Sequence, residues 1–259
     1  MSDQYNHDQE QLARGQVRSS EQHMTLFEHL AEFRNRLVYS AYGLVVGIGA
    51  GWGLSDRIFN LLRKPIEPYL TTGGLIYTGP MDKFVAHLKL AFVFGVVASC
   101  PYWLFHVWRF IAPGLYKSER KYAMGFIVAG TGLFALGVSF AYFIALPMAF
   151  KFLMTFGGDT DKPMIAIEEY LSFVSGTCLA FGGSFEMPLV LVTLGMLGLI
   201  SKKFLQDKRR YAYLIIGIIA AIVTPPDALS MLMLMVPLLI LFEASILIIG
   251  LFEARRQAV

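Results

Sequence analysis

The sequence predicts an all-α, polytopic integral membrane protein with six transmembrane helices, and its composition and hydropathy pattern support that prediction. Of the 259 residues, 56% are hydrophobic and 16% are charged, and the mean hydropathy is +0.55. A soluble domain carries about 25% charged residues. The apolar residues also cluster in six stretches, several of which exceed the ~20 residues that a helix needs to cross a hydrocarbon core. These observations exclude a disordered chain and an ordinary water-soluble globule.

The six spans follow from the apolar runs between polar connections. We expect them, in chain order, at Val38–Leu54, Val85–Ile111, Tyr122–Phe150, Tyr170–Ile200, Tyr211–Val223 and Ala228–Phe252. They belong to one membrane domain, residues 24–253, with a flexible cytoplasmic tail at 1–23 and a second cytoplasmic tail at 254–259. The first tail has no apolar run before a small-residue cleavage site, so we expect no removable signal peptide.

The last helical hairpin is expected to be short. Its fifth span has thirteen residues between Arg210 and the Thr224-Pro225-Pro226-Asp227 turn. A helix of that length rises only about 20 Å, against a hydrocarbon core of about 30 Å. The sixth span reaches Glu243 after fifteen residues. Such a hairpin implies either local thinning of the bilayer or a cavity that reaches into the membrane.

The distribution of Lys and Arg predicts that both termini are cytoplasmic, because short cytoplasmic segments carry the excess of positive charge. Six spans put both termini on one side, where the chain carries 15 of these residues, against six in the segments on the other side. The 15 are Arg14, Arg18, Arg34, Arg36, Arg109, Lys117, Arg120, Lys121, Lys202, Lys203, Lys208, Arg209, Arg210, Arg255 and Arg256. The six are Arg57, Arg63, Lys64, Lys83, Lys151 and Lys162.

The segment before the first span, residues 24–37, is typical of an amphipathic helix at the cytoplasmic interface. Thr25 and Glu28 form a capping box at its start. Its apolar stripe recurs at helical intervals, at Leu26, Leu30, Phe33 and Leu37. Glu28 and Glu32 project from the opposite face, which suits them to bind a cation. The alternative is a solvated face on which Glu32 and Arg36 form a pair worth only ~0.3 to 0.5 kcal/mol.

The connection between the second and third spans, residues 110–121, is unusually apolar for a loop in water. A Pro113-Gly114 pair forces a turn, and its apolar residues are Phe110, Leu115 and Tyr116. Together with the carboxylate of Glu119, they predict a docking surface for a ligand that is both cationic and apolar. The alternative is an aromatic belt followed by a helix start at Ser118, with Glu119 favoured by the helix dipole.

A third candidate lies inside the fourth span. Glu186 is near the middle of that apolar stretch, where an ionised carboxylate costs about 2.5 to 3.5 kcal/mol on insertion scales. It should therefore face other helices or a wet cavity, or be protonated. Pro188 removes a backbone donor and clashes with the carbonyl of Ser184, so we expect a kink there.

Other functions find little support in the residues. No phosphate-binding loop, nucleophile elbow or zinc signature is present, so we expect no enzyme activity, cofactor or metal site. The net charge of +3 gives no basic field for nucleic acid. Cys100 and Cys178 lie in apolar stretches, where a free thiol behaves as a small hydrophobe.

Five segments together resemble a known family. In order, they are His29-Leu30-x-Glu32-x-Arg34-x-Arg36-Leu37, the loop Trp108 to Arg120 (WRFIAPGLYKSER), Phe140-Ala141-Tyr142-Phe143, Phe185-Glu186-Met187-Pro188 and Thr224-Pro225-Pro226-Asp227. They resemble the signatures of the TatC family, the polytopic subunit of the twin-arginine protein translocase. The similarity runs from about Met24 to Glu253.

The resemblance implies that the chain recognises twin-arginine signal peptides of folded proteins and moves this cargo across the bacterial plasma (inner) membrane. The implied partners are TatA- and TatB-type single-span proteins, further copies of the chain and the lipid bilayer, and the implied energy source is the proton-motive force. Glu32 and Glu119 would hold the arginine pair through charge-assisted hydrogen bonds. The rest of the implied signal-peptide site is Arg34, Phe110, Leu115, Tyr116, Lys117 and Arg120. Thr224 and Asp227 would contact a partner helix.

The sequence departs from the family pattern at two positions. Lys121 stands where a second arginine is common, and Met231 follows Ser230 where the family commonly has a Ser-Gln pair. The alternative function is an ion-coupled carrier of small solutes, suggested by Glu186 and the broken fourth span, which should show matching interrupted helices in its two halves. An intramembrane hydrolase would need a nucleophile and a base buried together, and neither His87 nor His106 is suitably placed.

Overall fold

The computed structural model describes residues 26–70, 74–112, 123–156, 164–224 and 228–257, and these residues are helical apart from short connections and one isolated bridge. The helices are α2 (Leu26–Gly53), α3 (Ser55–Arg63), the 3-10 helix η1 (Glu67–Tyr69), α4 (Asp82–Ala98), α5 (Cys100–Ile111), α6 (Ala123–Phe140), the π-helical segment η4 (Ala141–Ala145), α7 (Leu146–Thr155), α8 (Ile167–Phe185), α9 (Met187–Met196), α10 (Lys202–Asp207), α11 (Arg209–Val223) and α12 (Ala228–Gln257). The all-α fold is confirmed, while the tail predicted at 1–23 lies outside the described residues.

Three described helical stretches are long and apolar enough to cross a membrane: Ala123–Thr155, Ile167–Met196 and Ala228–Arg255. Two bent pairs raise the number to five if each pair is one span. The pair α2 and α3 bends by 75°, and the pair α4 and α5 bends by 53°. The second bend breaks the expected Val85–Ile111 span at Ser99, because Pro101 sits in the first turn of α5 and cannot donate a backbone hydrogen bond.

The short fifth helix is present: α11 has 15 residues. Its first residues are level with Glu243 of α12, whose carboxylate accepts hydrogen bonds from Arg209 at 2.6 Å and from the Tyr213 hydroxyl at 2.7 Å. The paired part of the last hairpin is therefore short at both helices. Beyond Glu243, α12 continues to Gln257 and packs on α9.

Small residues let the membrane helices approach closely, as is common in membrane proteins. A Cβ added to Gly47 of α2 would lie 2.8 Å from the carbonyl oxygen of Gly95 on α4. At Gly137 of α6, a Cβ would lie 2.6 Å from the carbonyl oxygen of Phe181 on α8. These contacts fix α2 against α4 and α6 against α8.

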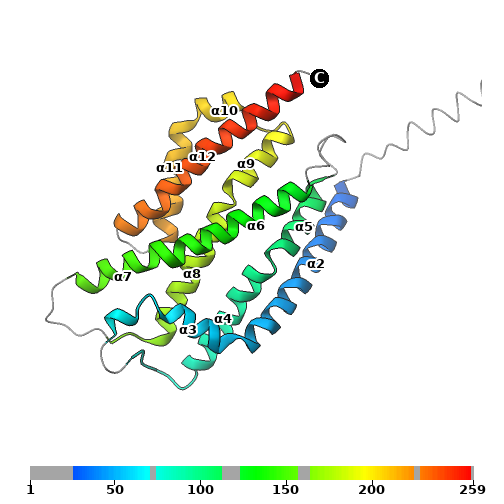
Figure 1. Ribbon diagram of the computed structural model, residues 1–259. Helices are drawn as coiled ribbons and strands as arrows, with labels where there is room; N and C mark the ends of the chain where they lie inside the picture. Colours follow the sequence, from blue (N-terminus) through cyan, green and yellow to red (C-terminus); the bar gives the residue numbers. More distant parts are fainter. Residues whose placement is uncertain (1–25, 71–73, 113–122, 157–163, 225–227, 258–259) are drawn as a thin grey trace, which may run out of the picture.

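Connections between helices gather at the end of the molecule opposite the start of α2 (Figure 1), and hydrogen bonds join them. The N–H of Ile76 donates to the carbonyl of Ile165 at 3.0 Å, and the carbonyl of Ile76 accepts from the N–H of Ile167 at 2.9 Å. These two bonds join Ile76 to the start of α8. The hydroxyl of Tyr170 donates to the carbonyl of Leu62, and that of Tyr142 donates to the carbonyl of Leu61 at 2.7 Å. These bonds tie the α3 region to α8 and η4.

Candidate functional site

The segment that carries Glu32 is helical as expected, but it continues without interruption into the first span as part of α2. Glu32 Oε1 accepts a hydrogen bond from the Arg36 guanidinium at 2.8 Å. The two side chains are only 17% and 18% exposed, so the pair does not lie on a solvated helix face. Among the described residues, Glu32 Oε2 and Arg36 Nε are buried and have no hydrogen-bond partner. The second oxygen of this carboxylate is thus covered by the chain but takes no donor within the described ranges.

Aromatic side chains join this end of α2 to the end of α5. The rings of Phe33 and Phe110 lie 5.3 Å apart between centroids. His106 lies one turn before Phe110 on α5. Its ring stacks on that of Tyr39 with 5.5 Å between centroids and meets the edge of the Tyr102 ring at 4.6 Å. Phe33 remains 47% exposed. This end of the molecule thus presents an apolar surface directly beside the Glu32 carboxylate.

The other predicted signal-peptide residues fall into two groups. Arg34 is exposed on α2. Leu115, Tyr116, Lys117, Glu119 and Arg120 lie outside the described residues. The residues that flank this loop, Ala112 and Ala123, both pack in one cluster around Trp108. The loop therefore leaves and re-enters the described structure at the same end as Phe110.

The fourth predicted span is interrupted at Glu186, between the end of α8 and the start of α9. The N–H of Glu186 donates to the carbonyl of Gly183 at 3.2 Å. Pro188 follows in the first turn of α9, as expected for a proline kink. Glu186 is 8% exposed. Both of its carboxylate oxygens are buried without a hydrogen-bond partner among the described residues.

Glu186 lines an apolar pocket of about 390 Å³ between α5, α6 and the two halves of the fourth span. Trp103, Leu104 and Val107 of α5 form one wall of this pocket. A Cβ added to Gly130 of α6 would lie 3.3 Å from Glu186 Oε2, so the absence of a side chain there makes room for the carboxylate. A buried acceptor without a donor is costly, which favours a role in which another molecule supplies that donor.

Of the two predicted partner-contact residues, Thr224 and Asp227, the structure describes only Thr224. Thr224 is buried at the end of α11, and its hydroxyl donates to the carbonyl of Ala220 at 2.7 Å. Its side chain is therefore occupied by its own helix. Asp227 lies outside the described residues.

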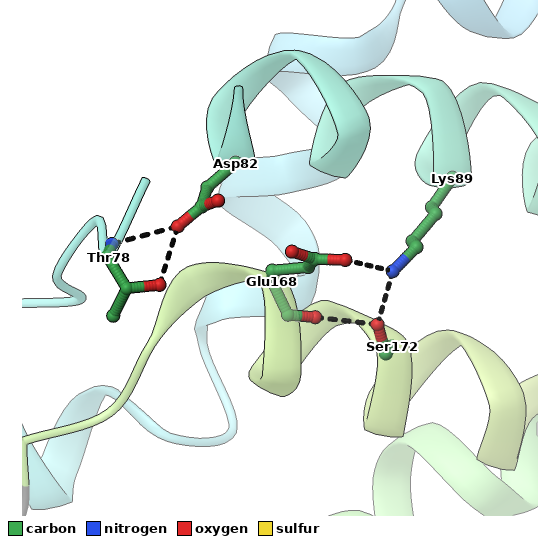
Figure 2. Close-up of polar contacts among 5 residues, drawn as sticks. All are labelled: Thr78, Asp82, Lys89, Glu168 and Ser172. Atoms are coloured by element: carbon green, nitrogen blue, oxygen red, sulfur yellow. Dashed lines mark hydrogen bonds and ion pairs between the residues drawn. The ribbon is translucent and has the colours of Figure 1, made fainter. Parts of the chain in front are cut away.

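No three His, Cys, Asp or Glu side chains within the described ranges are grouped so that they could hold a metal ion. Sequence reasoning missed a polar cluster between α4 and α8, where Lys89 contacts Glu168 and Ser172 (Figure 2). The spacing of Glu168 and Ser172, four residues apart, could have indicated their shared helix face. Their contact with Lys89 spans 79 and 83 residues and leaves no local sequence signal.

Together, the fold and these sites define a polytopic helical membrane protein with an acidic and aromatic surface at one end and a carboxylate buried among its membrane helices. The family described as Sec-independent protein translocase protein (TatC) matches residues 28–237, so the chain belongs to the TatC family.

Individual relatives agree with the family match. The Sec-independent protein translocase protein TatC of Desulforapulum autotrophicum is 37% identical over 232 residues, which cover 89% of this chain and 86% of that protein. TatCy of Bacillus subtilis is 39% identical over 227 residues, covering 87% of this chain and 88% of its own length. A crystal structure of the twin arginine translocase receptor TatC has a TM-score of 0.75 at 35% identity, covering 86% of this chain and 99% of that one.

The chain is therefore a membrane component of the twin-arginine, Sec-independent protein translocase. This confirms the resemblance drawn from the five segments. It does not support the alternative of an ion-coupled carrier for small solutes.

Proposed function

We propose that this chain recognises the twin-arginine signal peptides of folded cargo proteins, with Glu32 and Glu119 as the two carboxylates that hold the arginine pair. The observation that carries the proposal is the Glu32 carboxylate, which already accepts a guanidinium at 2.8 Å and keeps its second oxygen without a partner among the described residues. A carboxylate can accept hydrogen bonds from two guanidinium groups. A signal-peptide arginine would use the remaining oxygen.

The surroundings of Glu32 suit the rest of a signal peptide. Phe33 and Phe110 offer an apolar surface next to the carboxylate, and Leu115 and Tyr116 would add to it from the loop. Arg34, Lys117 and Arg120 complete the proposed site as charged groups around the bound segment. An apolar run that follows an arginine pair would thus meet aromatic side chains and then the membrane.

For the orientation, we propose six crossings with both termini in the cytoplasm of a bacterial plasma (inner) membrane. The excess of 15 Lys and Arg residues over six supports this orientation. Both the start of α2 and the end of α12 lie at the top of Figure 1, as an even number of crossings requires. The fifth crossing is α11, which must span a thinned region because it has only 15 residues.

After docking, we propose that Glu186 and the Pro188 kink act in the membrane-buried stage of transport. The unpartnered Glu186 carboxylate in its apolar pocket supports this role. The proposed partners are TatA- and TatB-type single-span proteins, which would meet the region of Thr224 and Asp227, and further copies of this chain. Transport would be driven by the proton-motive force, with no enzymatic step.

Titration of the detergent-solubilised chain with a labelled peptide that carries Arg-Arg and an apolar run tests the recognition step. Because a charge-assisted hydrogen bond contributes roughly 1.5 to 3 kcal/mol, Glu119→Ala should weaken binding by about 10- to 100-fold. Glu32→Ala should weaken it somewhat less, since Arg36 already shares that carboxylate. Glu67→Gln, which removes an exposed carboxylate on η1, is the control. Equal affinity for a twin-arginine and a twin-lysine peptide would contradict the assignment of the two glutamates.

A further inference from the structure

A second site lies far from the proposed signal-peptide surface, in a groove of about 530 Å³ between α4 and α8. The groove is lined by Leu88, Lys89, Phe92, Val93, Ser172, Ser175, Gly176 and Leu179. A Cβ added to Gly176 would have no neighbour within 4 Å, so this face of α8 is open space. No side chain in the described part of the protein fills this space beside Gly176.

One end of the groove carries a charged pair that retains binding capacity. The Lys89 ammonium donates to Glu168 Oε1 at 2.9 Å and to Ser172 Oγ at 2.7 Å (Figure 2). Ser172 Oγ in turn donates to the carbonyl of Glu168 at 2.7 Å. An ammonium has three N–H donors, so these contacts leave one for a ligand. The side chains of Lys89 and Glu168 are 37% and 41% exposed, so a ligand can reach both.

One helical turn deeper, the groove contains a buried hydroxyl. Ser175 is 6% exposed, and its Oγ has no hydrogen-bond partner among the described residues. Buried polar groups are nearly always hydrogen-bonded. The residue lies three positions beyond Ser172, or about 4.5 Å along the helix axis. If the Ser175 side chain rotates toward the groove, a ligand there would supply an acceptor about one turn below the group that contacts Lys89.

Beyond Ser175 the groove is apolar. Leu179 continues the same face of α8, and Phe92 of α4, which is one turn beyond Lys89 and 44% exposed, forms the opposite wall. Both helices begin at the end of the molecule where Ile76 bridges to the segment before α8. Later residues of each helix therefore lie deeper in the groove. From the surface inward the groove thus offers a charged pair, a hydroxyl and an apolar channel.

We propose that this groove binds a phospholipid, with its phosphate on Lys89, an ester carbonyl accepting from Ser175 and an acyl chain along Phe92 and Leu179. The order of these groups matches a phospholipid read from headgroup to chain, and the remaining N–H of the Lys89 ammonium can donate to a phosphate oxygen. The second oxygen of Glu168 would accept from a headgroup ammonium. The groove should therefore prefer phosphatidylethanolamine to phosphatidylglycerol, which carries no ammonium.

Native mass spectrometry of the purified full chain in detergent, titrated with each of these two lipids, tests the proposal. Lys89→Met should weaken phosphatidylethanolamine binding by about threefold to thirtyfold, the range for a hydrogen bond within a membrane. Ser175→Ala should weaken both lipids by a few-fold. Glu168→Gln should remove the preference between the lipids while binding persists.

Matched controls separate the groove from general effects. Lys83→Met removes an exposed ammonium from the same helix, and Ser245→Ala removes a buried hydroxyl that bonds to Leu241 on α12. Neither should change lipid binding. If Lys89→Met fails to fold because Glu168 is left unpaired, the double variant Lys89→Met/Glu168→Gln keeps the site neutral and should still lose binding.

A phosphatidylethanolamine with a diazirine on its acyl chain locates the bound lipid. Crosslinks should concentrate on peptides that contain Phe92 and Leu179, and Lys89→Met should reduce them. Crosslinks spread evenly over the chain, or identical lipid affinity in the Lys89→Met and Lys83→Met proteins, would overturn the proposal. A different pair of results would assign the groove to a partner helix instead. In that case Lys89→Met would leave lipid binding unchanged, and a synthetic single-span helix would crosslink to the groove.

Discussion

Arg36 should oppose the binding of a signal peptide, because its guanidinium already pairs with Glu32 of the proposed recognition site. Its guanidinium lies 2.8 Å from the carboxylate that an incoming arginine would use, and it cancels the charge of Glu32. Replacing it by glutamine keeps a donor near Glu32 but removes the positive charge. We therefore expect Arg36→Gln to bind a twin-arginine peptide more tightly than the parent chain.

The size of the effect follows from the charges. An incoming guanidinium on the free oxygen of Glu32 would lie about 6 Å from Arg36, which costs about 2.8 kcal/mol at an effective dielectric constant of ~20 and about 0.7 kcal/mol in water. The side chains are 17% and 18% exposed, which places the site between these limits. Loss of this repulsion corresponds to a gain in affinity of about 3- to 100-fold. Thermal stability should fall, because Glu32 loses its charged partner in a largely buried setting.

Fluorescence anisotropy of a labelled twin-arginine peptide measures this change. The gain should shrink at high salt, since screening weakens the repulsion that is removed. Arg57→Gln removes one exposed positive charge from α3 at the opposite end and controls for net charge. If Arg36→Gln instead weakens binding as much as Glu32→Gln does, Arg36 positions the carboxylate or contacts the peptide, and the reasoning is refuted.

Three further predictions concern other parts of the fold. Glu186→Gln should bind signal peptide like the parent but export less folded cargo if the carboxylate must carry a charge or proton; full export activity would refute the need for titration. Gly137→Ala should destabilise the protein by about 1 to 3 kcal/mol through overpacking against a backbone carbonyl 2.6 Å away, whereas Gly132→Ala on the same helix meets nothing within 4 Å and should not; equal melting temperatures would contradict the packing argument. In a cysteine-free background, Ser118→Cys should react with an impermeant thiol reagent only from the cytoplasm and Thr72→Cys only from outside; labelling of both from one face would overturn the six-span topology.

The sequence predicts the helical class and most helix positions because apolar runs report directly on membrane burial. It misses the bend at Ser99, which divides one long apolar stretch into α4 and α5. An apolar run does not show whether the helix axis stays straight or bends. Pro101 is the local signal that could have indicated the break. The short α11 was predictable, because its length is bounded by charged residues and the Thr224-Pro225-Pro226-Asp227 turn.

The candidate sites were predictable to different degrees. Glu186 stands out because a carboxylate within an apolar run is costly wherever the helix faces. The environment of Glu32 was not predictable from the helix pattern, which is equally consistent with a solvated pair. Next to it, α2 packs against α5 through Phe33 and Phe110, a contact between residues distant in sequence. The α4–α8 groove depends on similarly distant contacts.

The groove and the Glu186 pocket occupy one face of α8, because positions 172, 176, 179, 183 and 186 recur at helical intervals. Both Gly176 and Gly183 on this face have open space where a Cβ would lie. The two ends differ in chemistry. The exposed pair of Lys89 and Glu168 suits a lipid headgroup, whereas the buried carboxylate of Glu186 can be satisfied only by a proton or by a donor that another molecule brings. Glu168 and Glu186 are 18 residues apart, about 27 Å along the helix, so substitutions at Lys89 and Glu186 should affect lipid headgroup binding and export separately.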